Sequence, residues 1–257
     1  MIEVKNLYKE FDGTPILKGI NATFENGKTS LVIGTSGSGK TVFLKCMLGL
    51  LQPEKGDIIY DGVHYSEMND VEKRDLKKDI GMVFQGSALF DSSTVEENVM
   101  FPLKMFTNQS YEEKLERVNF VLNRVNLENA NHKFPAELSG GMQKRVAIAR
   151  AIVMKPKYLF CDEPNSGLDP KTSTVIDNLI QEITQEYNIT TIINSHDMNS
   201  VMEIGQKIIL MKFGVKEWEG TNNEVFKTDN ESLVDFVYSS NLFKKVREAQ
   251  LKEGLKS

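Results

Sequence analysis

The sequence predicts an α/β fold in which a parallel β-sheet core carries a helical insert. Short apolar runs at 30–33, 158–161 and 190–195 alternate with segments of helical periodicity, which is typical of strands buried on both faces of a parallel sheet. A glycine-rich string at 34–41 joins the first of these strands to a helix. Between about residues 86 and 155 the pattern is helical only. Together these observations predict a sheet core with an inserted helical lobe.

The amino-terminal part of the chain is β-rich, and we expect an antiparallel β subdomain there. The alternation at 2–4 and the run at 20–24 predict two strands. A Glu-Asn-Gly turn at 25–27 then leads into the buried strand at 30–33. Farther along, residues 57–63 predict a hairpin with an Asp-Gly turn.

The next elements lead into the helical insert. A helix is expected over 42–51, directly after the glycine-rich string, and a short buried strand over 80–84. Ser139 is a good helix N-cap, and Pro156 marks the end of the helix that it begins. Apolar residues three and four apart complete the pattern of the insert, which predicts three helices, over 95–105, 111–127 and 139–154.

Strands and helices alternate again after the insert. Strands are expected at 158–161, 190–195 and 207–211, and Pro170 begins a helix between the first two. The tail at 232–256 has apolar residues near helical spacing. The predicted division of the chain is a core lobe at 1–85 and 156–225, a helical subdomain at 86–155 and a C-terminal helical extension at 226–257.

Composition narrows the class of protein. The 257 residues are 40% apolar and 26% charged, which describes an ordinary globular protein. No stretch approaches the roughly 20 apolar residues of a membrane helix, and the amino terminus does not resemble a signal peptide, so a cytoplasmic location is expected. The net charge of −5 argues against nucleic acid as a partner. Both cysteines lie in apolar runs and are expected in the core.

The glycine-rich string has the spacing of a P-loop, which binds the phosphates of a nucleotide. Its glycines let backbone N–H groups converge on phosphate, and the following helix points its positive end at the anion. Lys40 adds a charge at the β and γ phosphates, and the Thr41 hydroxyl suits Mg²⁺. A turn that merely caps a helix is the alternative. The candidate nucleotide-binding residues are Gly34, Thr35, Ser36, Gly37, Ser38, Gly39, Lys40 and Thr41.

Two carboxylates follow the apolar run at 158–161. They stand at the carboxyl end of a predicted strand, where ligands gather in sheets of this kind. Asp162 is suited to hold Mg²⁺ through its water shell, and Glu163 is suited to act as the general base for an attacking water. A helix-capping acidic pair is the alternative.

A second motif narrows the class of nucleotide-binding protein. Leu138-Ser-Gly-Gly-Met-Gln143 stands just upstream of Tyr158-Leu-Phe-Cys-Asp-Glu163, and this arrangement resembles the ATP-binding cassette (ABC) ATPases. The resemblance covers roughly residues 1 to 220. It implies an ABC ATPase fold built on a P-loop NTPase core, with ATP and Mg²⁺ bound and ATP hydrolysed.

The same resemblance implies roles for four further residues. Gln85 resembles the glutamine that senses Mg²⁺ and the attacking water and that hinges the helical insert. His196 resembles the switch histidine at the γ-phosphate, and Phe11 stands where the family has an adenine-stacking aromatic residue. Asp169 closes a string that resembles the D-loop, which crosses to a partner subunit. From the residues alone, a surface glutamine, a structural histidine and a core phenylalanine remain open alternatives.

The signature residues Ser139, Gly140 and Gly141 imply a second copy of the chain. They offer a hydroxyl and a helix amino terminus to a γ-phosphate, yet they lie on the insert, away from the P-loop. In the family two cassettes pair head to tail, and each supplies this helix end to the ATP of the other. Two departures from the family pattern, Met142 for glutamine and Gly167 for alanine, remove no group assigned to the chemistry.

Three short strings at 86–90, 98–102 and 137–142 resemble the ATPase of Mla/Mce-type lipid transporters. This finer resemblance implies an integral-membrane permease, a lipid-binding Mce-domain protein and a phospholipid or related cargo moving between bacterial membranes. It also implies a peripheral position on the cytoplasmic face of the inner membrane. The alternatives are the ATPase of an amino-acid importer or lipoprotein extractor, or a non-transport cassette for iron–sulfur assembly or cell division.

The permease is expected to dock between the lobes, near Gln85 and the segment 86–101. Phe90 and Phe101, together with the apolar residues between them, Val95 and Met100, exceed what the loop needs for its own packing. Some of them are expected to form a socket for a permease helix, and the alternative is that all belong to the core. The tail at 232–256 either docks on its own domain or reaches across to the partner cassette.

Overall fold

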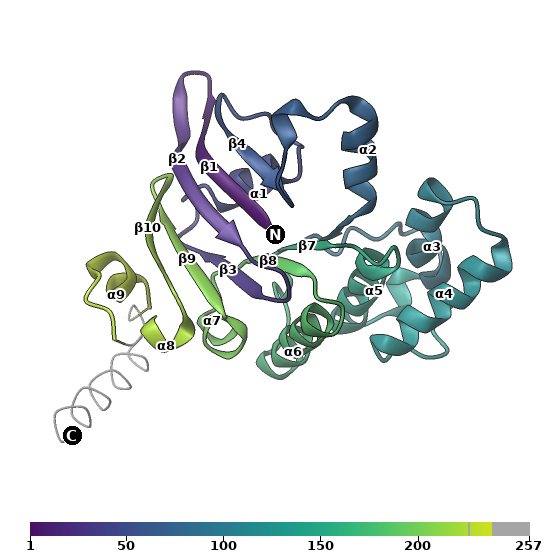
Figure 1. The fold of residues 1–257 in the computed structure, drawn as a ribbon. Helices are drawn as coiled ribbons and strands as arrows, with labels where there is room; N and C mark the ends of the chain where they lie inside the picture. The colour runs from purple at the N-terminus through teal and green to yellow at the C-terminus, as the bar shows by residue number, and fades with distance from the viewer. Residues whose placement is uncertain (226, 238–257) are drawn as a thin grey trace.

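The computed structural model describes residues 1–225 and 227–237, and it contains two β-sheets and a helical lobe (Figure 1). The larger sheet has six strands in the order β10-β9-β3-β8-β7-β6, and all neighbours except β10 and β9 pair in parallel. The predicted parallel-sheet core is confirmed. Its strands are β3 (Thr29–Ile33), β6 (Ile80–Val83), β7 (Tyr158–Asp162), β8 (Thr190–Asn194), β9 (Lys207–Lys212) and β10 (Val215–Gly220).

The amino-terminal sheet is antiparallel, as expected, in the order β2-β1-β4-β5. The apolar patterns at 2–4 and 20–24 mark only parts of two much longer strands, because the remaining residues of both are largely exposed. The Asp-Gly turn is present, with φ of 48° at Asp61 and 84° at Gly62. The strands are β1 (Ile2–Phe11), β2 (Thr14–Phe24), β4 (Lys55–Tyr60) and β5 (Val63–His64).

The helical lobe consists of α3 (Val95–Phe106), α4 (Tyr111–Arg124) and α5 (Gly140–Ile152). Thr94 and Ser110 begin α3 and α4 with capping boxes. The predicted extension of α4 to residue 127 is wrong, because Asn126 adopts the left-handed region at φ 55°. The other helices are α1 (Lys40–Met47), α2 (Asp70–Lys78), α6 (Pro170–Glu186), α7 (Met198–Ile204), α8 (Asn222–Val225) and α9 (Glu231–Val237).

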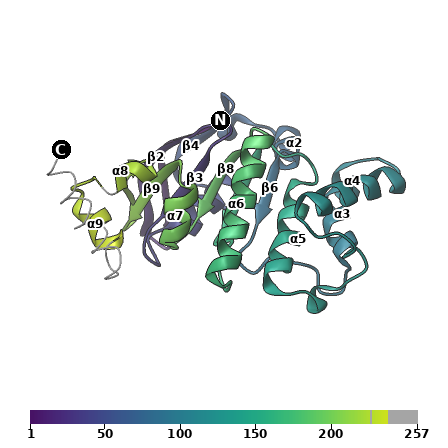
Figure 2. The ribbon, with the colours of Figure 1, turned by 90° about the horizontal axis from the view of Figure 1, so that it is seen from below.

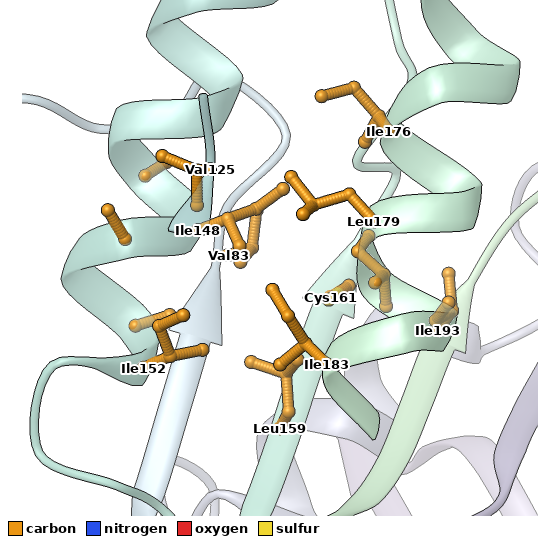
Figure 3. Close-up of a cluster of buried hydrophobic side chains, with 14 of the residues drawn as sticks. Val83, Val125, Ile148, Ile152, Leu159, Cys161, Ile176, Leu179, Ile183 and Ile193 are labelled. Atoms are coloured by element: carbon orange, nitrogen blue, oxygen red, sulfur yellow. The ribbon is translucent and has the colours of Figure 1, made fainter. Parts of the chain in front are cut away.

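Helices cover both faces of the six-stranded sheet. On one face, α5, α6 and α7 lie side by side (Figure 2). There Ile148 of α5 and Ile183 of α6 pack toward Val83, Leu159 and Cys161 of the strands (Figure 3). On the other face, α1 lies between the two sheets, where Phe43 and Cys46 are among its buried residues. Both cysteines are buried and free, as expected.

Other boundaries and elements also differ from expectation. Helix α1 begins at Lys40 and ends at Met47, not at 51, since Gly49 has φ 66° and ends the helix. Strand β10 was not predicted, and neither was α7. The described part of the tail docks on its own chain, where Leu233 and Val237 are buried in the core. The expected helical pattern beyond 237, and most of the expected 226–257 extension, lie outside the described residues.

Within residues 1–225 and 227–237, none of the helices combines the length and apolar character that crossing a bilayer requires.

Candidate functional site

The glycine-rich string forms the turn between β3 and α1. Gly39 is the N-cap of α1, with φ 103°, and Gly34 has φ 148°. A Cβ on Gly34 would lie 2.2 Å from the backbone oxygen of Met211, so only glycine fits there. The loop therefore brings bare backbone to the amino terminus of a helix, the arrangement that binds phosphate.

Lys40 curls back over this loop. Its Nζ donates to the backbone oxygens of Gly34, at 2.7 Å, and Thr35, at 3.1 Å. Burial lowers the pKa of Lys40, while the nearby Glu163 and Asp162 carboxylates act to raise it. The ammonium thus lies between the loop and the two carboxylates, where a phosphate would meet it.

The two carboxylates stand at the end of β7. The Nδ2 of Asn194, on the neighbouring strand β8, donates to Asp162 Oδ1 at 3.1 Å, and the Glu163 backbone N–H donates to the backbone oxygen of Asn194 at 3.0 Å. Glu163 has φ 50°, a strained conformation that is uncommon outside glycine and is often found at functional sites. Its Oε2 lies 2.7 Å from His196 Nδ1. Strand pairing therefore brings Glu163 and His196 together.

A single cleft of about 940 Å³ collects most of the predicted site residues. Phe11 lines it and is 43% exposed, which contradicts its alternative reading as a core residue. Ser38 is the exception within the P-loop, since it is buried and does not line the cleft. The lining consists of Phe11, Ile16, Gly34, Thr35, Ser36, Gly37, Gly39, Lys40, Thr41, Val42, Gln85, Asp162, Glu163, His196, Met198, Asp235 and Phe236.

Five lining residues were not predicted: Ile16, Val42, Met198, Asp235 and Phe236. Asp235 and Phe236 belong to α9, which comes close to the P-loop only through the tertiary fold. Ile16 lies on β2, which pairs with the strand that ends in Phe11. The hairpin was the one sequence signal that could have predicted Ile16 at the site. When Phe11 at the end of β1 lines the cleft, the first residues of the paired strand β2 must lie nearby.

The donor set suits Mg²⁺. The Thr41 hydroxyl, the Gln85 amide and the Asp162 carboxylate are oxygen ligands at one cleft, and Mg²⁺ prefers a few such ligands together with phosphate and water. Among the described residues no group of three or more His, Cys, Asp or Glu side chains could hold a metal alone. The residues present therefore fit a metal that arrives with a nucleotide.

Gln85 lies where the sheet passes into the helical lobe. Its Nε2 donates to Ser166 Oγ at 3.2 Å, and its backbone oxygen accepts from the buried Lys144 of α5. Arg150, also on α5, donates to the backbone oxygens of Ser87 and Ala88, both at 2.7 Å. The loop after β6 is therefore hydrogen-bonded to α5, the helix whose N-cap is Ser139.

The signature residues lie outside the cleft. Ser139 is the N-cap of α5, and its Oγ accepts from the Met142 backbone N–H at 3.4 Å. A Cβ on Gly141 would lie 2.7 Å from Thr172 of α6, so this helix end packs closely against its own chain. Gly140 is exposed in the same turn. Within one chain these residues do not meet the P-loop.

Asp169 is also separate from the cleft. It caps α6, accepting from the Thr172 backbone N–H at 3.1 Å and from the Thr172 hydroxyl at 2.5 Å. These hydrogen bonds lower the pKa of Asp169. Its contacts within the chain are those of a helix cap.

Comparison with known proteins identifies the class. The family model described as "ABC transporter" matches residues 17–166. The chain therefore belongs to the ABC transporter family, its fold is the ABC cassette, and it is an ATPase.

The names of similar proteins refer to different cargoes. The "Methionine import ATP-binding protein MetN" of Clostridium tetani is 40% identical over 82% of this chain and 66% of its own length. MetN of Campylobacter jejuni is 36% identical over 93% of this chain and 76% of its own length. The "Probable ribonucleotide transport ATP-binding protein mkl" of Mycobacterium tuberculosis is 37% identical over 87% of this chain and 64% of its own length. The chain thus spans about two thirds of the length of the first and third of these relatives.

Solved structures agree on the fold. The dimeric structure of MJ0796, a bacterial ABC transporter cassette, has a TM-score of 0.78 at 33% identity and covers 86% of this chain and 99% of its own. A post-hydrolysis state of the same cassette, bound to ADP and Pi, has a TM-score of 0.77 at 34% identity. The cbiO1 protein of Clostridium perfringens, part of the transporter complex cbiONQ, has a TM-score of 0.83 at 31% identity. The match covers 97% of this chain and 98% of cbiO1.

Proposed function

We propose that the chain is the ATP-hydrolysing subunit of a membrane transporter. The observation that carries this proposal is one cleft in which the P-loop faces Asp162, Glu163 and His196. The P-loop supplies backbone donors and the Lys40 charge for the phosphates. The carboxylates supply a metal ligand and a general base.

The roles of the side chains follow from their positions. Glu163 accepts a proton from the attacking water, and its contact with His196 Nδ1 leaves Nε2 of that exposed ring for a γ-phosphate oxygen. Thr41, Gln85 and Asp162 would hold Mg²⁺, which neutralises charge on the phosphates when bound. Phe11 stacks on the adenine, which needs an aromatic face and not a hydroxyl.

A complete site requires two copies of the chain. Ser139 and Gly140 are exposed at the amino terminus of α5 and Gly141 is half-buried, yet none of the three lines the cleft of its own chain. A second copy arranged head to tail would bring this helix end to the γ-phosphate. Asp169, exposed at the start of α6, would lie at the same junction. The dimeric MJ0796 cassette supports this arrangement.

We further propose that a permease docks in a groove beside the Gln85 loop. The groove has a volume of about 380 Å³. Phe90 and Phe101 line it, are 44% and 39% exposed, and have ring centroids 4.9 Å apart. Val95 and Met100 do not contribute, because they are fully buried in the core. Of the four apolar residues, Phe90 and Phe101 are therefore the ones that a permease helix could reach, and three basic residues, Lys77, Lys78 and Arg150, also line the groove.

Cysteine cross-linking tests this docking surface. Asp91→Cys and Ser92→Cys lie on the exposed loop beside the groove, and we expect both to cross-link to the permease in native membranes. Glu116→Cys, exposed on α4 of the same lobe, is the matched control and should not. The native cysteines are buried and will not add background. Cross-links from position 116, with none from 91 or 92, would move the docking surface elsewhere.

For the cargo we propose a phospholipid or related lipid, on the support of the strings at 86–90, 98–102 and 137–142. On this proposal a lipid-binding Mce-domain protein accompanies the permease, and the chain lies peripherally on the cytoplasmic face of the inner membrane. Methionine import is the second candidate, because the relatives named MetN are up to 40% identical.

A reconstituted complex separates the two cargo proposals. Purification through the tagged chain should yield the permease, and vesicles containing the complex should transfer a fluorescent phospholipid to acceptor vesicles only with ATP. The same vesicles should show no ATP-dependent accumulation of labelled methionine. Methionine accumulation without lipid transfer would replace the lipid proposal by the second candidate. Recovery of soluble partners alone would point to a non-transport cassette.

A further inference from the structure

A buried carboxylate lies behind the candidate site. Asp177, on the inner side of α6, is only 2% exposed. Helix α6 packs beside α7, the short helix that follows His196 (Figure 2). No ion pair of Asp177 occurs within the part of the chain that the structure describes. A charge so placed needs other partners.

The partners of Asp177 come from the two segments that carry catalytic candidates. Its Oδ1 accepts from Asn165 Nδ2 at 2.7 Å, and its Oδ2 accepts from Ser200 Oγ at 2.6 Å. Asn165 stands two residues after Glu163 in the loop that follows β7, and Ser200 stands four residues after His196 on α7. Asn165 Nδ2 also donates to Ser200 Oγ at 3.2 Å, which closes the triangle.

Stability does not explain this carboxylate. Burial raises the pKa of Asp177 to about 6, against the two hydrogen bonds that lower it, and the acidic side chains Asp197 and Glu203 raise it further. A raised pKa means that the ionised form is disfavoured in the fold relative to the unfolded chain. Buried charges that cost stability are concentrated at functional sites.

We propose that Asp177 is a positioning residue for hydrolysis. It ties the loop that carries Glu163 and the helix that follows His196 to one point on α6. The separation of those two side chains, 2.7 Å between Glu163 Oε2 and His196 Nδ1, therefore depends on a group that touches neither. This inference rests on the proposed ATPase function, because it assigns a role within that reaction.

Paired alanine truncations on the same helix test the assignment. Asp177→Ala removes both anchoring hydrogen bonds, and kcat should fall about tenfold or more, since small misplacements of reacting groups cost that much. KM for ATP should stay within about threefold, because the P-loop is untouched. Thr184→Ala is the control: Thr184 is fully buried on α6 and hydrogen-bonded to Ile180 and Thr191, away from both loops. It should leave kcat unchanged.

A conservative variant separates positioning from charge. In Asp177→Asn the amide oxygen still accepts one hydrogen bond, and the new N–H₂ can donate to Asn165 Oδ1, which is buried without a partner among the described residues. This variant should recover kcat to within about threefold of the native chain. It should also melt no lower at pH 8, because the disfavoured ionised group is gone. A kcat as low as that of the alanine variant would contradict the proposal.

Hydrogen exchange tests the anchor without any turnover. In Asp177→Ala, backbone amides at 163–169 and at 196–201 should both exchange faster than in the native chain, whereas Thr184→Ala should leave both segments unchanged. Unchanged exchange in both segments of Asp177→Ala would overturn the inference. So would equal losses of kcat in the two alanine variants. A native chain that hydrolyses no ATP would instead refute the proposed function, while the exchange measurement would still judge the anchor.

Discussion

Glu163→Gln is expected to lower ATP turnover by about 10²-fold or more while ATP binding is retained. The carboxylate can accept a proton from water, and the isosteric amide cannot. Glu163 Oε2 already lies 2.7 Å from His196, so the substitution changes proton affinity with little change of shape. The P-loop that binds the phosphates is unaltered. Steady-state phosphate release and the equilibrium binding of a fluorescent ATP analogue measure the two quantities separately.

Glu182→Gln is the matched control for this substitution. Glu182 pairs with Arg124 on the surface, 3.3 Å away, and its side chain is 63% exposed. It should hydrolyse ATP at the native rate, since exposed ion pairs contribute little. Near-native turnover in Glu163→Gln would remove Glu163 from the role of general base. Loss of binding together with turnover would show that the glutamate supports the nucleotide site itself.

Lys40→Ala is expected to weaken ATP binding by about 10- to 100-fold, the range for losing a charged hydrogen bond. The ammonium is the one cation that lines the described cleft, and its bonds to Gly34 and Thr35 hold it over the phosphate loop. Both binding and hydrolysis should therefore fail, unlike in Glu163→Gln. Calorimetric titration with ATP and Mg²⁺ measures the loss.

The control for the lysine lies on the same helix. Lys45 is exposed in the last turn of α1, so Lys45→Ala removes an equal charge at the far end of the helix from the P-loop. Its affinity for ATP should remain within about threefold of the native value. Equal losses in both variants would mean that net charge governs binding. Unchanged affinity in Lys40→Ala would place the phosphates elsewhere.

Much of the fold could be predicted because its core strands are short, apolar and bounded by turn residues. Strand β8 is buried along its whole length, and so is β3. Strand β10 was missed, because Lys216, Glu217 and Glu219 mask its alternation on an edge strand that is at most half-buried. Helix α7 was missed because seven residues are too few for a clear helical period.

The candidate site likewise has residues that the local sequence predicts and residues that only the tertiary fold brings together. The P-loop and the Asp162-Glu163 pair are contiguous strings, so the local sequence is enough to predict a role for them. Asp177 was not predicted, because a single aspartate on an amphipathic helix has no local signal, and its partners lie on two other segments. For a related reason the sequence did not show which apolar residues at 90–101 are accessible, because burial of Val95 and Met100 depends on α3 packing against α5.

Mixing two inactive variants tests most directly the claim that two chains share each ATP. A Ser139→Arg subunit and a Lys40→Ala subunit should each fail alone to hydrolyse ATP or to dimerise with it. In the head-to-tail pair, both defects fall in one site and the other site is intact. The mixture should therefore associate in an ATP-dependent way and regain hydrolysis. If the native chain dimerises and hydrolyses ATP under the same conditions but the mixture stays monomeric and inactive, the shared site is contradicted.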